Sequence, residues 1–139
     1  MNITALSYGA QIRLAKGLTT EARALASRLP PLNPSRLYVL ASTGDSAAAL
    51  ATLRTAEASK AHPPSIRMAR AYLMLAIRDT SAALDALGRA IDEGEVFPSY
   101  RSVLDPMYRP IWSSLRYRAL LQRLGLGGVQ LQLPVLRGR

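Results

Sequence analysis

Few side chains in this sequence could perform catalysis or hold a metal ion, and they do not cluster. His62 is the single histidine and cysteine is absent, whereas a protein zinc site draws on several such ligands. As a general base His62 would need an orienting partner, and none is recognisable, so we interpret it as a loop residue. Asp92, Glu93 and Glu95 lack the spacing and the glycine of a calcium-binding loop. We interpret these three acids as a solvated helix end whose charge nearby arginines offset.

Phosphate binding and nucleophilic catalysis find no support in the pattern either. Residues 125–128 are rich in glycine, but they follow a predicted helix, whereas a phosphate-binding loop opens one. Serines are numerous, yet none lies in the strand–turn–helix context of a hydrolase nucleophile. We therefore predict a protein that is not an enzyme and uses no cofactor or metal.

Composition favours a helical protein with a basic surface. The 139 residues suit one domain, and abundant alanine with few aromatic residues favours closely packed helices. The net charge of +9 attracts acidic proteins, nucleic acid or anionic headgroups, although scattered arginines more often form a solvated surface. We expect a protein or peptide partner, with an acidic one favoured by the charge. Nucleic acid is the less favoured alternative, and self-association stays open.

No segment predicts export or membrane insertion. Residues 1–8 lack a basic region followed by a long apolar run. The longest apolar stretch, residues 71–77, is too short to cross a bilayer. We expect a cytoplasmic protein without a membrane span, either free-standing or a fragment of a larger chain.

The strongest pattern is a repeat with a period of 34 residues. Residues 37–56 align with residues 71–90 without a gap. The matching pairs are Tyr38 with Tyr72, Asp45 with Asp79, Ala49 with Ala83, Leu50 with Leu84, Leu53 with Leu87, and Ala56 with Ala90. A period of this length predicts stacked helix–turn–helix units, which bury a shared apolar face.

Local signals divide the first unit, residues 33–62, into two helices. Asn33 can accept a backbone N–H as N-cap, and Pro34 is tolerated in the first turn. Gly44 is suited to the left-handed conformation that ends this helix, and Asp45 is the predicted N-cap of the next helix. Pro63 and Pro64 stop the second helix.

The second unit, residues 64–94, follows the same plan. Ser65 predicts the cap of a helix that runs to about residue 77, and Asp79 or Ser81 predicts the cap of its partner, which Gly94 ends. Arg78 stands where the first unit has its turn glycine, so this turn must differ or carry strain.

Further helices flank the two units. Residues 7–15 and 20–29 predict a degenerate pair around Gly17, with Thr20 as a cap. Downstream, Ser113 or Ser114 predicts the cap of a last helix, and Gly125 its left-handed end. We thus predict one helical domain, residues 1–126, with the degenerate pair at 5–29, a cap region at 98–126, and a tail at 127–139.

These units resemble the tetratricopeptide repeat family. The matching residues are Gly44-Asp45, Ala49, Leu53 and Ala56 in the first unit, and Asp79, Ala83, Leu87 and Ala90 in the second. The resemblance implies an all-α fold, a right-handed α-solenoid of antiparallel helix pairs with a C-terminal capping helix. Arg36 and Arg70 depart from it, since the family has a buried leucine there.

The closing segment is similar to the end of many bacterial repeat arrays. The residues that carry this similarity are Asp105-Pro106, Tyr108, Pro110, Arg116, Tyr117, Leu120-Leu121 and Leu124-Gly125-Leu126, while Leu115 replaces the usual proline. Such arrays follow cyclase or kinase domains or winged-helix regulators. The similarity implies, as an alternative function, a regulatory, sensory or dimerisation module of a bacterial signalling protein.

Stacked repeats bind peptides along a concave groove, and the register predicts which residues face it. Tyr38 and Tyr72 are the candidate anchors, because tyrosine combines a large contact area with a hydroxyl. The other candidates are Ser42, Met68 and Leu75 as neighbours, and Arg36 and Arg70 as a basic strip for an acidic partner. The alternatives are core packing for the tyrosines and a solvated surface for the arginines. We interpret Tyr100, Tyr108 and Trp112 as core residues under the last helix.

Overall fold

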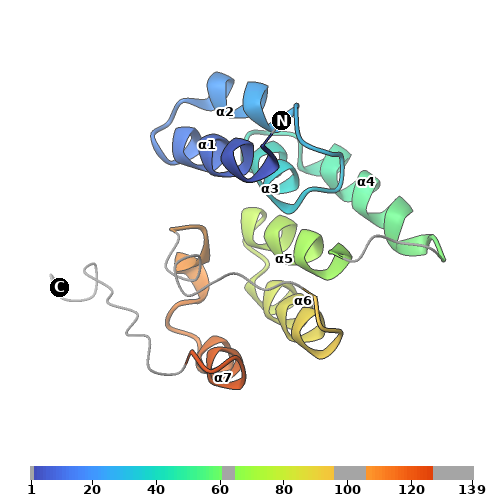
Figure 1. The fold of residues 1–139 in the computed structure, drawn as a ribbon, viewed down its shortest axis with the longest axis vertical. Coiled ribbons are helices and arrows are strands. Elements are labelled where there is room, and N and C mark those ends of the chain that lie inside the picture. The colour runs from blue at the N-terminus through green and yellow to red at the C-terminus, as the bar shows by residue number, and fades with distance from the viewer. Residues whose placement is uncertain (1, 61–64, 96–105, 127–139) are drawn as a thin grey trace, which may run out of the picture.

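Every regular element in the described part of this chain is helical (Figure 1). The computed structural model describes residues 2–60, 65–95 and 106–126. The elements are α1 (Ile3–Ala15), α2 (Thr19–Ala26), α3 (Pro34–Ser42), α4 (Ser46–Ala58), α5 (Ile66–Ala76), α6 (Thr80–Asp92), the 3₁₀ helix η2 (Pro106–Ile111) and α7 (Leu115–Arg123). The all-α class is confirmed for these residues. His62, Pro63, Pro64, Tyr100, Asp105 and the tail lie outside them.

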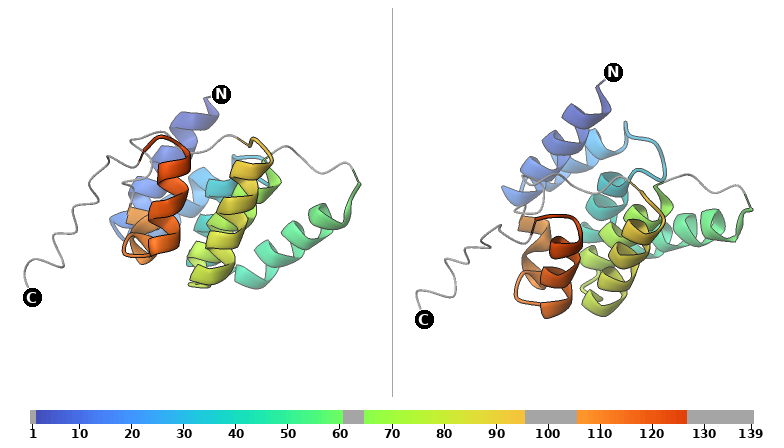
Figure 2. Two further views of the ribbon diagram at one scale, coloured as in Figure 1. Left: turned by 90° about the horizontal axis from the view of Figure 1, so that it is seen from below. Right: turned by 60° about the horizontal axis from the view of Figure 1, so that its bottom comes forward.

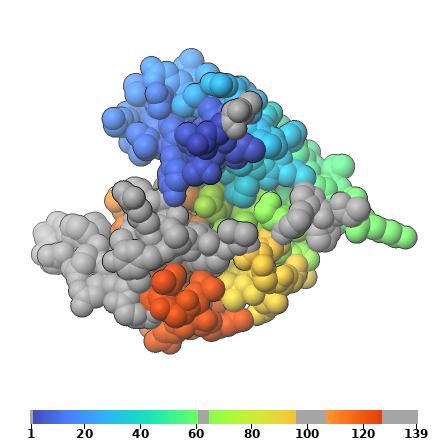
Figure 3. Space-filling view, viewed as in Figure 1, coloured from blue at the N-terminus to red at the C-terminus, as the bar shows by residue number. Residues whose placement is uncertain are grey.

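The helices form successive antiparallel pairs, and the first helix of each later pair packs against the pair before it. α3 packs against α1 and α2 on one side and against α5 on the other, while η2 and α7 lie against α6 (Figures 1 and 2). In the space-filling view, α1 and α2 form one end of the molecule and α6 and α7 the other (Figure 3). No helix in the described ranges has both the length and the apolar character to cross a bilayer.

Five helices end in the same way, with one residue in the left-handed conformation. These residues are Gly17, Gly44, Arg78, Gly94 and Gly125. At α7 the amide of Leu126 donates to the carbonyl of Leu121 at 2.8 Å, and that of Gly125 to Gln122 at 3.0 Å. This pair of bonds satisfies carbonyls that the helix itself leaves unpaired, as predicted for Gly125.

The predicted helix starts are confirmed at three positions. The side-chain oxygen of Asn33 accepts hydrogen bonds from the amides of Ser35 and Arg36, at 2.9 and 3.2 Å, with Pro34 in the first turn. Asp79 accepts from the amide of Ala82 at 3.0 Å, and Ser114 does the same for α7. Each cap lies next to the helix it serves, so the local sequence suffices to find it.

At three other predicted caps the side chain makes no capping hydrogen bond, although Asp45 and Ser65 do occupy the N-cap position. α2 begins at Thr19 behind Leu18, so Thr20 lies inside the helix. Asp45 precedes α4, but its carboxylate pairs with the guanidinium of Arg23 instead of capping. Ser65 precedes α5 without a side-chain bond to the helix. At Asp45 the guanidinium of Arg23 holds the carboxylate away from the helix. At the start of α5 the carboxylate of Glu95, remote in sequence, accepts from the first amides in place of Ser65.

The 34-residue repeat corresponds to equivalent packing positions. Ala49 and Ala83 are both buried, and Leu53 and Leu87 are both fully buried. All four belong to one apolar cluster that runs through α3 to α7. The alanines let neighbouring helices approach closely, while the leucines fill the space between them.

The outer helices of the two units differ in how much they bury. α4 buries only Ala49 and Leu53, and it projects from the molecule (Figure 2). α6 buries Ala83, Leu84, Ala86, Leu87 and Ala90. The difference arises mainly within the pairs, because α6 packs along its partner α5 much more extensively than α4 packs against α3. α7 and η2 add further contacts to α6.

Three tyrosines stack beneath the last helices. The ring of Tyr108 lies parallel to that of Tyr117, with centroids 6.0 Å apart, and edge-on to that of Tyr72 at 6.1 Å. Tyr108 and Trp112 are buried, which confirms both as core residues.

Candidate functional site

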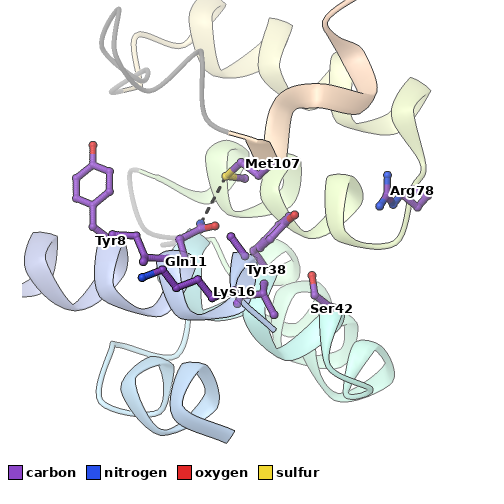
Figure 4. Close-up of a pocket in the computed structure, with 10 residues that line it drawn as sticks. Tyr8, Gln11, Lys16, Tyr38, Ser42, Arg78 and Met107 are labelled. Atoms are coloured by element: carbon purple, nitrogen blue, oxygen red, sulfur yellow. Dashed lines mark hydrogen bonds between the residues drawn. The ribbon is translucent and has the colours of Figure 1, made fainter. Parts of the chain in front are cut away.

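An open cavity of about 460 Å³ lies where α1, α3, η2 and the α5–α6 turn meet (Figure 4). We call it the α1–α3 groove. Its lining residues are Tyr8, Gln11, Ile12, Leu14, Ala15, Lys16, Tyr38, Ser42, Arg78 and Met107. A second cavity of about 230 Å³ shares Tyr38, Arg78 and Met107 and adds Arg109 and Pro110. The two cavities adjoin at these shared residues, and we refer to them together as the hollow.

Tyr38 forms the floor of this groove. It is half-buried on α3, and burial raises the pKa of its hydroxyl above the ordinary 10.0. The positive charge of Arg78 and a hydrogen bond with Ser42 act in the opposite direction and lower that pKa. The hydroxyl therefore stays protonated at neutral pH and faces a guanidinium and a second hydroxyl.

Gln11 joins three parts of the groove wall. Its amide nitrogen donates to the Ser35 hydroxyl at 3.3 Å and to the Met107 sulfur at 3.5 Å (Figure 4). The first bond holds α1 to α3, and the second holds α1 to η2. The rim near Gln11 is thereby built from residues 96 positions apart in the sequence.

Arg78 enters the groove from a strained turn. Its φ angle is +65°, and it is the only residue other than glycine with positive φ in the described ranges. A left-handed conformation costs an L-residue about 1–2 kcal/mol. The corresponding residue of the first unit is Gly44, which adopts this conformation without a Cβ clash. The strain foreseen for this turn is thus present.

The charge of the hollow is one-sided. Among the described residues, Lys16, Arg78 and Arg109 line it, and no carboxylate does. Elsewhere in the described residues, arginines form ion pairs with carboxylates. These pairs are Arg13–Glu21, Arg23–Asp45, Arg67–Glu93, Arg70–Glu57, Arg116–Asp85 and Arg123–Asp92. The hollow therefore favours anionic over cationic ligands.

Of the predicted groove residues, only Tyr38 and Ser42 line the cavity. Tyr72 occupies the matching position on α5, but its ring packs against Tyr108 of η2, which agrees with the alternative of core packing. Met68 and Leu75 are buried in the core, with 4% and 2% exposure, and offer no groove surface. Both side chains are covered because α5 packs against α3, α4, α6 and η2.

The two repeated arginines serve the stack itself. Arg36 donates to the carbonyls of Ser27 and Leu29, at 2.9 and 2.8 Å, just past the end of α2. Arg70 donates to both carboxylate oxygens of Glu57 in the last turn of α4, at 3.0 and 3.2 Å. Each thus ties the first helix of its unit to the end of the preceding pair, so neither contributes a free basic strip.

Sequence reasoning missed Gln11, Arg78 and Met107 as groove residues. Arg78 carried a signal, because an arginine replaces the glycine of the equivalent turn. Gln11 and Met107 carried none, since their contact depends on how the ends of the chain fold together.

The residues considered for metal or acid–base chemistry lie elsewhere. Asp92 and Glu93 pair with Arg123 and Arg67, as expected of a helix end offset by arginines. Within the described ranges no three residues of the histidine, cysteine, aspartate or glutamate types come together as metal ligands. Comparison with protein-family models, with curated proteins and with solved structures finds no match.

Proposed function

We propose that this chain is a tetratricopeptide-like, right-handed stack of helix pairs that binds a segment of another protein in the α1–α3 groove. The repeat supports the architecture, because residues 34 apart occupy equivalent buried positions in α4 and α6. The proposal is for recognition alone, without a catalytic step. One observation carries it: an open, mostly apolar hollow lies at the junction of three helix pairs, with a half-buried tyrosine as its floor.

The contact between Tyr72 and Tyr108 supports the binding mode. The equivalent tyrosine of the next unit already receives an aromatic residue edge-on, from another part of the same chain. Tyr38 presents the same kind of ring on an open cavity, so a partner's aromatic or branched aliphatic residue would pack on it similarly.

Selection from a phage-displayed random-peptide library on the immobilised protein tests this function. We expect selected peptides, once synthesised and labelled, to bind wild type and to bind Tyr38→Ala roughly thirtyfold more weakly, the loss of a hot-spot residue worth about 2 kcal/mol. Fluorescence anisotropy gives the affinities, and circular dichroism should show unchanged helicity.

Leu115→Ala is the matched control. Leu115 is a large apolar residue on α7, 81% exposed and outside the groove, so its removal should leave peptide affinity unchanged. Equal affinity of wild type and Tyr38→Ala for every selected peptide would refute the groove assignment.

A further inference from the structure

The side chain of Arg78 has a role that its turn does not explain. In both units the amide of the residue after the left-handed position donates to the equivalent carbonyl of the preceding helix. Asp45 donates to Leu40 and Asp79 to Met74, each at 2.9 Å. The glycine of the first unit thus supports the same cap without strain. A positive charge at a helix C-terminus contributes about 0.3–1 kcal/mol, which is less than the strain of about 1–2 kcal/mol, so the helix end alone does not account for an arginine here.

That side chain faces the hollow. Arg78 lines both cavities, it acts electrostatically on the Tyr38 hydroxyl, and its guanidinium makes no ion pair within the described residues. Arg109 differs, because its guanidinium lies over the Trp112 ring, 5.6 Å from the centroid. Strained backbone conformations cluster at functional sites, and this one holds beside an apolar anchor site a guanidinium that forms no ion pair with the described residues.

We propose that Arg78 is a specificity-determining residue that binds the carboxylate of an aspartate or glutamate in the partner segment. This inference rests on the proposed function. The carboxylate would accept hydrogen bonds from the guanidinium while the neighbouring apolar residue of the ligand packs on Tyr38. Lys16 on the α1 side of the hollow adds a second positive charge, and no acid among the described lining residues opposes it. An acidic, apolar segment is therefore the complementary ligand.

Three variants separate charge from strain. Arg78→Gly removes both, Arg78→Lys keeps a positive charge, and Arg54→Ala removes an exposed arginine of α4 that lines neither cavity. The probes are the selected peptides and copies in which each Asp or Glu is replaced by its amide.

We expect acids beside an apolar residue in the selected peptides. Arg78→Gly should weaken their binding about tenfold, as loss of a charged hydrogen bond does, and amide replacement should weaken binding to wild type by a similar factor. Arg78→Lys should retain most of the affinity, and Arg54→Ala all of it. Because the strain is relieved, Arg78→Gly should also raise Tm by about 3–6 °C.

Titration of the phenol provides an independent readout. Since the positive charge of Arg78 lowers the pKa of Tyr38, Arg78→Gly should move that pKa further up. The difference between spectrophotometric titrations with and without the Tyr38→Phe change isolates this hydroxyl.

The outcomes separate this inference from the proposed function. Peptides that require Tyr38 but bind Arg78→Gly as tightly as wild type would overturn the role of Arg78 and leave the groove intact. A lower Tm for Arg78→Gly would also overturn it, because the side chain would then serve the fold. Binding insensitive to Tyr38→Ala would remove the groove itself.

Discussion

Glu95 caps a helix from the far end of its own unit. Its two carboxylate oxygens accept hydrogen bonds from the amides of Arg67 and Met68, at 3.1 and 3.0 Å, in the first turn of α5. Those amides have no partner within the helix, and a negative charge is favourable at a helix N-terminus. Glu95 follows the end of α6, so one side chain joins the start of the α5–α6 pair to its finish.

We expect Glu95→Ala to lower the free energy of unfolding by about 1 kcal/mol, the usual cost of a lost N-cap. Chemical denaturation followed by circular dichroism measures it. Glu21→Ala is the comparison, because its ion pair with Arg13 is exposed and should contribute almost nothing. Equal stability of the two variants would show that the Glu95 carboxylate is not a cap.

Single residues also mark the limit of what the sequence could predict. Asn33, Asp79 and Ser114 were found because a cap normally lies next to its helix. Glu95 lies 28 positions beyond the amide of Arg67, and no local pattern records that distance. The same holds for Tyr72: the repeat aligns it with Tyr38, but only the folded chain places Tyr108 against its ring.

At the scale of elements, α4 and α6 repeat each other in position but not in surroundings. The helix starts and ends follow from local propensity and capping, so most boundaries agreed with the sequence to within a few residues. α1 was the exception, since it begins at Ile3 behind an Asn2 cap that the repeat register could not reveal. Which faces of a helix are buried depends on the helices that pack against it, and the local sequence does not determine those neighbours.

We predict that Leu53→Ala and Leu87→Ala each destabilise the fold by about 3 kcal/mol, within the range for a fully buried leucine. Similar costs for the two variants in denaturant titration would reflect equivalent packing positions. Leu115→Ala should change stability by less than about 0.5 kcal/mol because the side chain is exposed. A negligible cost at either buried leucine would contradict the equivalence.

At the scale of the whole molecule, burial is greatest in the middle of the stack. α5 buries seven of its 11 residues, whereas α1 buries two of 13. In a stack of helices each helix is stabilised by its neighbours, so a central helix gains contacts on both sides and a terminal helix on a single side.

Hydrogen exchange should reveal this gradient. We expect the amides of α5 to exchange slowest, near the rate set by global unfolding, and those of α1 to exchange fastest among the helices. Mass spectrometry of peptic fragments resolves the order. Slowest exchange in α1 would show that the stack is not anchored at its centre.

The bridge from Gln11 to Met107 makes the groove sensitive to the number of helix pairs. α1 belongs to the first pair, α3 to the second and the turn with Arg78 to the third, and Met107 follows them all. An inserted fourth pair would shift the closing segment by about one helix spacing, roughly 10 Å, and Met107 could no longer reach Gln11. A duplication between Gln11 and Met107 would therefore open the groove, so the part of the chain that forms this cavity cannot gain a pair without losing the contact.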